Sequence, residues 1–183
     1  QNTYVILTAD HGLAVGEHGL MGKQNMYDCI IRVPWIIAGP GIKNGSRVDE
    51  LVYQHSNFAT TCELAGIPVP KAVEFPSCVD LIKGGHTPKH DAIFSRYRDF
   101  QRAVRTKDYK LIVYPKAKIV QIFDMKNDPW EMHNLASHPK LTSVKVQLTQ
   151  RLHQFQQELD DELELGNVSE FADQGHVPVQ EQI

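Results

Sequence analysis

The stretch that decides the predicted fold is Thr3-Tyr-Val-Ile-Leu-Thr-Ala-Asp10-His11-Gly12, close to the start of the 183-residue sequence. Residues 4–7 form an uninterrupted apolar run, which is typical of a strand buried on both faces. The run stops at an acid, an imidazole and a glycine, so we expect the strand to end there. Because ligands of open α/β sheets bind outside the carboxyl ends of the strands, Asp10 and His11 are predicted to face a site.

These residue types also suit a charged ligand. Asp10 and His11 can supply an oxygen and a nitrogen to one divalent cation, and the glycines that follow let the backbone approach a small ligand. Lys23 adds a mobile cation for an anionic substrate. For the Asp-His-Gly triplet alone, a turn in which the aspartate bonds its own backbone is the alternative interpretation.

The motifs that follow keep a fixed order. Thr8-Ala-Asp-His-Gly12, Gly16-Glu-His-Gly19, Gly22-Lys23, Tyr27 and Arg32-Val-Pro34 together resemble the second-half signature of the type I sulfatases, in the alkaline-phosphatase-like superfamily. The resemblance continues through Pro40-Gly-Ile42, Glu63-Leu-Ala-Gly-Ile-Pro68, Arg102-Ala-Val-Arg105, Tyr109-Lys-Leu-Ile112 and Phe123-Asp-Met-Lys-Asn-Asp-Pro-Trp-Glu-Met-His-Asn-Leu135. It covers residues 1 to about 165, and several motifs in register are more specific than any one of them.

The resemblance implies an α/β fold, the C-terminal part of an alkaline-phosphatase-like sulfatase. It also implies that Asp10 and His11 are metal ligands and that Lys23 contacts the sulfate, as a catalytic and substrate-binding residue. Calcium is the expected ion, with Mg²⁺ or Mn²⁺ as alternatives because His11 stands where the family has an amide.

The nucleophile of this family is a formylglycine, made from Cys or Ser in a Cys/Ser-x-Pro/Ala-x-Arg motif. Neither Cys29, Cys62 nor Cys78 is followed by that pattern. We therefore expect the formylglycine to lie in an amino-terminal half outside this sequence, and the chain alone to be inactive. Three unevenly spaced cysteines argue against a disulfide framework and predict buried thiols, compatible with a reducing compartment.

Composition excludes other classes. With 42% hydrophobic and 22% charged residues the chain can bury a core, and a net charge of −3 gives no basic field for nucleic acid or an anionic membrane. No apolar run approaches membrane-spanning length.

We expect three parts: residues 1–90 in the main α/β domain, 91–165 as a C-terminal subdomain, and 166–183 as a tail. In the first part Ser56 is predicted to cap a helix through Ala65, with Phe58, Cys62 and Ala65 facing the core. Residues 69–90 are interpreted as a connecting loop, with His86 and His90 in solvent.

The second part should be an antiparallel meander covered by a long helix. Four β-prone runs lie at residues 92–97, 102–106, 109–114 and 118–123, separated by turn residues. Apolar residues then recur at helical spacing from Leu141 to Leu163, and this stripe is expected to pack across the meander. Residues 168–183 lose periodicity and should be ordered only on a partner.

The predicted function is therefore the C-terminal portion of a sulfuric ester hydrolase acting on a sulfated small molecule or sugar. Alternatives are a phosphonate monoesterase or phosphodiesterase of the same superfamily, and a non-catalytic interaction module. Because neighbours of the first strand are expected from outside this chain, its exposed sheet face predicts a homo-oligomer or a covering partner.

Overall fold

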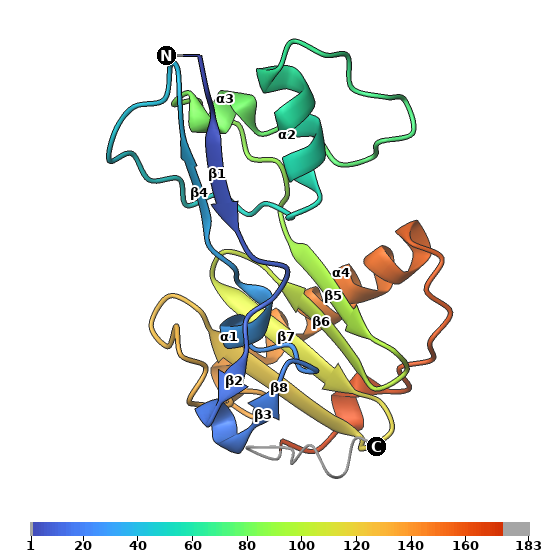
Figure 1. Ribbon diagram of the computed structural model, residues 1–183. Helices are drawn as coiled ribbons and strands as arrows, with labels where there is room; N and C mark the ends of the chain where they lie inside the picture. Colours follow the sequence, from blue (N-terminus) through green and yellow to red (C-terminus); the bar gives the residue numbers. More distant parts are fainter. Residues whose placement is uncertain (1, 174–183) are drawn as a thin grey trace. The chain divides into compact units, whose positions relative to one another are not determined.

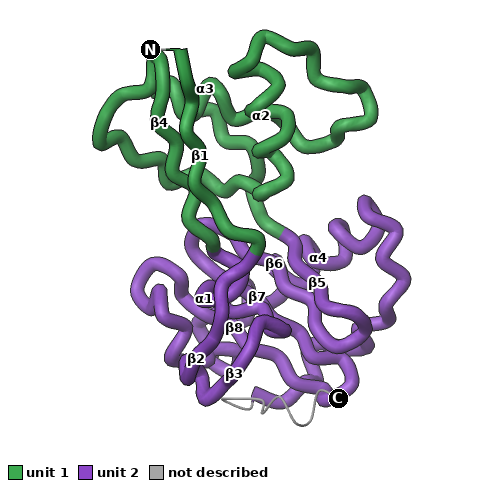
Figure 2. Tube along the Cα trace, in the orientation of Figure 1, with its two compact units in different colours: residues 1–10, 33–93 green, residues 11–32, 94–183 purple. Residues whose placement is uncertain are grey.

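The computed structural model describes residues 2–173, in two compact units (Figures 1 and 2). Unit 1 comprises residues 1–10 and 33–93, and unit 2 comprises residues 11–32 and 94–183. Residues 11–32, which the sequence placed with the first domain, thus pack with the second unit. Within residues 2–173 we find no helix of the length and apolarity needed to span a bilayer. The division of the chain into a main α/β domain (residues 1–90) and a C-terminal subdomain (residues 91–165) stays a prediction.

Unit 1 contains a two-stranded antiparallel sheet of β1 (Val5–Thr8) and β4 (Trp35–Ala38). Leu7 lies opposite Ile36 in this pair. The expectation of a strand buried on both faces is wrong for the described residues, because β1 has one neighbour and one covered face. Val5, Leu7 and Ile36 are 62%, 56% and 62% exposed.

The helices of unit 1 are α2 (Ser56–Leu64) and α3 (Val79–Ile82), which contact each other. The buried face of α2 carries Ser56, Ala59 and Thr60, whereas Phe58 and Ala65 are exposed, so the predicted core face was wrong. The face with Thr60 is the buried one because the Thr60 hydroxyl accepts a hydrogen bond from the Cys78 amide at 3.0 Å. Ser56 is also not the N-cap, since His55 occupies that position and no side chain caps the helix.

The segment expected to be a connecting loop is more ordered than its composition suggested. It contains α3, and His90 lies edge-on to the Tyr53 ring at 4.8 Å between centroids. His90 is half-buried, so the prediction that it lies in solvent is wrong, and this burial lowers its pKa. His86 is exposed, as expected.

Unit 2 is built on a four-stranded antiparallel sheet in the order β5 (Ile93–Tyr97), β6 (Gln101–Arg105), β7 (Tyr109–Tyr114), β8 (Ile119–Asp124). This confirms the predicted meander. Helix α4 (Thr142–Glu158), preceded by the 3₁₀ turn η2 (Pro139–Leu141), packs on β6 and β7 (Figure 1). Leu148, Leu152 and Phe155 are its buried apolar residues. The helix ends before Leu163 because Asp160 takes a left-handed backbone with φ of 49°.

A second layer of unit 2 comes from residues 11–32. It contains a short hairpin of β2 (Ala14–Val15) and β3 (Met21–Gly22), joined by η1 (Glu17–Gly19), and the single-turn helix α1 (Asp28–Ile31). Apolar side chains of this segment share a core with the sheet: Ala14, Leu20, Met26, Tyr27 and Ile30 with Ala103, Ile112, Tyr114, Ile119 and Phe123. Almost every residue of β7 and β8 is buried. Because successive strand residues face opposite sides, this means that the sheet is covered on both faces.

Part of the expected tail is docked. Val168 is buried in the 3₁₀ turn η3 (Val168–Glu170), and Ala172 forms a parallel bridge with Ile119. The Val120 amide donates to the Ala172 carbonyl at 3.1 Å, which extends the sheet beyond β8. The prediction of a partner-dependent tail is therefore wrong up to residue 173, and residues 174–183 lie outside the described residues.

A buried ion pair joins β6 to the chain that follows α4. The Arg102 guanidinium donates to both carboxylate oxygens of Asp161, at 2.5 and 2.6 Å, and both side chains are almost fully buried. This contact holds the pKa of Asp161 below its usual range.

We expect Arg102→Met to lower the free energy of unfolding by up to about 3–5 kcal/mol, because the buried Asp161 carboxylate loses its bidentate partner and keeps only Arg96 at 3.6 Å and a hydrogen bond from Gln156 at 3.3 Å. The cost should shrink as the pH falls below the usual aspartate range, since wild-type Asp161 then becomes protonated and loses its own pairing. Urea unfolding of both chains across pH measures this. Lys116→Met, which breaks the exposed pair with Asp99, is the control and should cost less than about 1 kcal/mol. A cost for Arg102→Met that did not change with pH would contradict the argument.

The exposed face of the β1/β4 pair predicts association of the isolated chain. Apolar surface left in water is unfavourable by about 25 cal/mol per Å². We expect a Leu7→Thr/Ile36→Thr variant to shift the chain toward monomer in light scattering, with Val146→Thr, on the exposed side of α4, as the control. A wild-type chain that is monomeric at high concentration would refute the prediction.

Candidate functional site

The structure brings together His11 and Lys23, two of the predicted site residues. Lys23 Nζ lies 2.8 Å from His11 Nε2, and His11 Nδ1 lies 2.7 Å from the Gly12 carbonyl oxygen. A carbonyl can only accept and an ammonium can only donate, so Nδ1 carries the proton and Nε2 presents its lone pair to Lys23. His11 is therefore in its neutral form in this contact.

Asp10 follows β1 in unit 1, and its side chain is exposed. Across residues 2–173, no group of three or more His, Cys, Asp or Glu side chains could hold a metal ion. The pairing of Asp10 with His11 as metal ligands therefore stays a prediction.

The donor set nevertheless suits a divalent cation. A carboxylate and a neutral imidazole are metal ligands, and a ring N–H bonded to a backbone carbonyl is the usual support of a ligating histidine. Calcium takes about six to eight oxygen ligands, so further donors would have to come from elsewhere. In addition, a metal on His11 Nε2 and the Lys23 ammonium would compete for the same lone pair.

Helix α1 supports the residue next to His11. The Gly12 amide donates to the Ile30 carbonyl at 2.7 Å. A Cβ added at Gly12 would lie 1.9 Å from the Cys29 carbonyl oxygen, so this close approach requires glycine. The position of residue 12 is consequently set by the end of α1.

His18 has a packing contact. Its ring stacks on Tyr27, with centroids 3.9 Å apart and 10° between the planes. The Tyr27 hydroxyl in turn donates to Gln121 Oε1 at 3.0 Å, and burial raises the pKa of Tyr27. These contacts favour a packing role for the His18 ring over a role in proton transfer.

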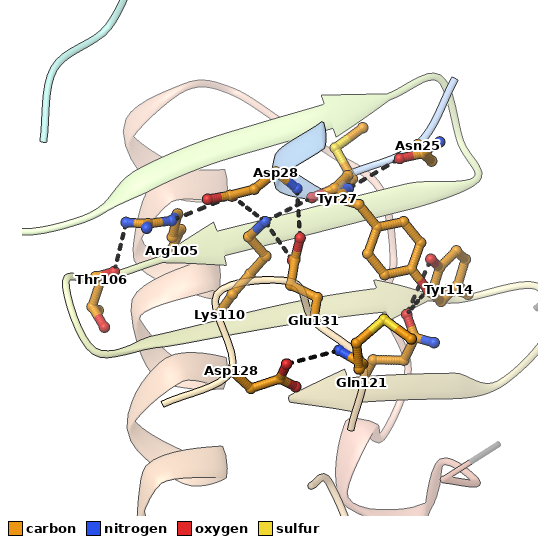
Figure 3. A network of polar contacts seen from close by, with 12 residues as sticks. Asn25, Tyr27, Asp28, Arg105, Thr106, Lys110, Tyr114, Gln121, Asp128 and Glu131 are labelled. Carbon is orange, nitrogen blue, oxygen red and sulfur yellow. Dashed lines mark hydrogen bonds and ion pairs between the residues drawn. The ribbon is translucent and has the colours of Figure 1, made fainter. Parts of the chain in front are cut away.

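A buried network of charges lies between residues 11–32 and the sheet (Figure 3). Lys110, on β7, is fully buried, and its ammonium donates to Asp28 Oδ1 at 2.5 Å, Glu131 Oε1 at 2.6 Å and the Met26 carbonyl at 3.1 Å. Glu131 Oε2 accepts from the Asp28 amide at 2.6 Å, and Arg105 Nε lies 3.4 Å from Asp28 Oδ1. Two carboxylates thus face two cations.

Burial raises the pKa of Glu131, although Lys110 acts in the opposite direction. This network was not predicted from the sequence. The available signal was a lysine in the middle of the apolar run Tyr109-Lys-Leu-Ile-Val-Tyr114, at a position that shares a face with Ile112 and Tyr114.

The three cysteines are free thiols, of which Cys78 is buried as predicted, whereas Cys29 and Cys62 are only half-buried. Burial raises the pKa of Cys29 to about 11, so it stays protonated near neutral pH. Burial also raises the pKa of Cys78. Neither is an activated nucleophile.

Comparison with known proteins agrees with the fold and with the motifs. Residues 16–158 match the family described as N-sulphoglucosamine sulphohydrolase, C-terminal. This chain belongs to that family. The resemblance to the type I sulfatases and the predicted fold class, the C-terminal part of an alkaline-phosphatase-like sulfatase, are confirmed.

The curated relatives of this chain are named as sulfatases. It is 35% identical over 156 residues to Delta 4,5-hexuronate-2-O-sulfatase of Bacteroides thetaiotaomicron, covering 79% of this chain and 32% of the relative. It is 31% identical over 167 residues to human Arylsulfatase K, covering 84% of this chain and 31% of the relative. The chain therefore spans about a third of the length of these relatives.

Solved structures show the same relationship. A protein in complex with its substrate D-glucosamine-2-N,6-O-disulfate matches 88% of this chain and 35% of its own, with a TM-score of 0.79 and 29% identity. A phosphonate monoester hydrolase of Agrobacterium radiobacter matches 85% of this chain and 35% of its own, with a TM-score of 0.70 but 22% identity, which shows likeness in fold alone.

The close approach at Gly12 gives a prediction for the site. Gly12→Ala should displace residue 12 from the end of α1 and disturb the His11–Lys23 contact, detected as a change in the ¹⁵N resonances of the His11 ring at fixed pH. Gly166→Ala, in the same unit, introduces backbone strain at a φ of 72° without a close backbone contact, and is the control. Both should destabilise the chain by roughly 1–3 kcal/mol. Unchanged His11 resonances in Gly12→Ala would contradict the inferred support.

Proposed function

We propose that this chain is the C-terminal portion of a sulfuric ester hydrolase, in which Asp10 and His11 bind the metal and Lys23 binds the sulfate. The observation that carries the proposal is the contact between Lys23 and His11, at 2.8 Å, in a chain whose residues 16–158 match a sulfatase family. An exposed cation beside a neutral imidazole, at two positions that the resemblance assigns to the site, supports the proposal.

This pair suits the chemistry of a sulfate ester. The negative charge of the ester repels an oxygen nucleophile, so catalysis requires cations at the sulfuryl oxygens. The Lys23 ammonium is one such cation. A bound divalent ion would supply a second, as a Lewis acid.

The contact also suggests an order of events for the two side chains. When an anionic substrate arrives, the exposed Lys23 ammonium can turn from His11 Nε2 to the sulfate oxygens. This movement frees the Nε2 lone pair as a ligand, while Nδ1 keeps its proton and still donates it to the Gly12 carbonyl. Substrate binding would thereby favour metal binding at His11, and the reverse.

The proposed substrate class is a sulfated sugar or small molecule, and the nucleophile is a formylglycine outside this sequence. Support comes from relatives named Delta 4,5-hexuronate-2-O-sulfatase and N-acetylglucosamine-6-O-sulfatase. A phosphonate monoester or phosphodiester is the alternative substrate.

The test uses the complete natural polypeptide that contains this sequence. We expect metal-dependent hydrolysis of a sulfated monosaccharide or aryl sulfate, faster than of the matched phosphodiester. Lys23→Gln should lower kcat/KM by about 10²–10³, because one charge-stabilising group is lost. Lys43→Gln, in a surface loop of unit 1, is the matched control and should leave the rate unchanged.

The other outcomes discriminate between the alternatives. Faster turnover of the phosphodiester would favour the phosphonate-hydrolase class. A complete polypeptide without any metal-dependent turnover would favour a non-catalytic module. The 183-residue chain is a negative control in the same assay, since it offers no formylglycine motif.

A further inference from the structure

The buried charges of unit 2 are connected to the candidate site by a short path. Lys110 and Glu131 bind the start of α1, at the Asp28 side chain and amide. The end of α1 binds Gly12 through the Ile30 carbonyl, and the Gly12 carbonyl accepts from His11 Nδ1. The path from Lys110 to His11 therefore runs through one four-residue helix and one glycine.

The helix depends on these contacts for its position. A single turn is not stable by itself in water, because nucleating a helix costs more than one hydrogen bond returns. The apolar packing of Tyr27 and Ile30 holds the segment to the sheet, but such packing is not directional. Hydrogen bonds to Asp28 are directional, so they can fix where α1 begins.

The chemistry of Lys110 is unusual for a residue that serves stability alone. Replacing buried ions by apolar groups of similar size is often neutral or stabilising, since the ions lose their hydration. Yet Lys110 is fully buried and uses all three of its N–H donors, on Asp28, Glu131 and the Met26 carbonyl. A fully satisfied polar network specifies one arrangement more strictly than an apolar contact does.

We propose that Lys110, together with Asp28 and Glu131, is a positioning group for His11. By fixing the start of α1 it fixes the Ile30 carbonyl and Gly12, and so holds His11 Nε2 within reach of Lys23. The importance of this for catalysis rests on the proposed function, whereas the positioning itself is a property of the chain in hand.

The test compares two variants of the 183-residue chain that each break a buried ion pair in unit 2. Lys110→Met keeps the length of the side chain and removes the charge, and Arg102→Met does the same at the Arg102–Asp161 pair. Amide hydrogen exchange is measured at Gly12 and, as an internal reference, at Ile112 and Val113 of β7, the strand that is paired on both sides. The ¹⁵N resonances of the His11 ring are recorded at one fixed pH.

For Lys110→Met we expect Gly12 to exchange at least about 10-fold faster relative to the sheet amides, as a local opening, with altered His11 resonances. In Arg102→Met the ratio of Gly12 to sheet exchange should stay as in the wild type. An unchanged ratio in Lys110→Met, or the same change in both variants, would overturn the proposal.

Two further variants separate positioning from stability. Glu131→Gln keeps the shape of the side chain and should shift the Gly12 ratio in the same direction by less, which provides a result if Lys110→Met does not fold. In Lys110→Met/Asp28→Asn/Glu131→Gln both carboxylates that Lys110→Met leaves without the lysine are neutral, and the remaining cation, Arg105, is partly exposed and keeps its hydrogen bond to the Thr106 carbonyl. Stability should therefore recover in part while the Gly12 ratio stays raised. Recovery of both would show that the ions act through global stability, and would overturn the proposal. None of these measurements requires turnover. A negative result would therefore overturn the positioning proposal without bearing on the proposed sulfatase function, which is tested by the hydrolysis assay.

Discussion

The structure of unit 2 depends on one constraint, the burial of the Lys110 ammonium between two carboxylates. A fully buried cation must find its partners inside the protein, because water is not there to solvate it. Asp28 comes from the segment after the site loop and Glu131 from the loop after β8, so the lysine joins three separate parts of the chain. If the lysine moved away, both carboxylates would lose their buried cation, and if either carboxylate moved away, Lys110 would lose one of its three acceptors. The arrangement is therefore satisfied in one geometry.

This constraint explains why residues 11–32 fold with the C-terminal sheet. The sheet has two faces, and α4 covers one of them. The other is covered by the hairpin and α1, which contribute Leu20, Met26, Tyr27 and Ile30 to the core. The loop with His11 and Lys23 is thereby attached to the meander subdomain. In the proposed sulfatase, the C-terminal subdomain is then part of the support of the active site, in addition to its own fold.

The two site residues that meet are held differently. His11 is bonded through Nδ1 to a backbone carbonyl whose glycine is itself bonded to α1, whereas Lys23 is exposed on a flexible stem. A fixed imidazole and a mobile ammonium suit the exchange we propose, in which the lysine leaves Nε2 for an anion. In unit 1, by contrast, the face of β1 and β4 that carries Val5, Leu7 and Ile36 is apolar and exposed.

The sequence by itself determined the local elements and the site motif. The alternation and turn residues between 92 and 124 predicted the four strands, and the spacing from Leu141 to Phe155 predicted α4, because both patterns are set by neighbours along the chain. It also singled out His11 and Lys23. Tertiary structure decided the rest. The buried face of α2 is set by its contact with Cys78. Covering of β1 depends on neighbours beyond the described residues. Ala172 docks because β8 has a free edge. The role of Lys110 could not be predicted, because a lysine in a strand is ordinarily solvated, and its two carboxylate partners lie 82 and 21 residues away.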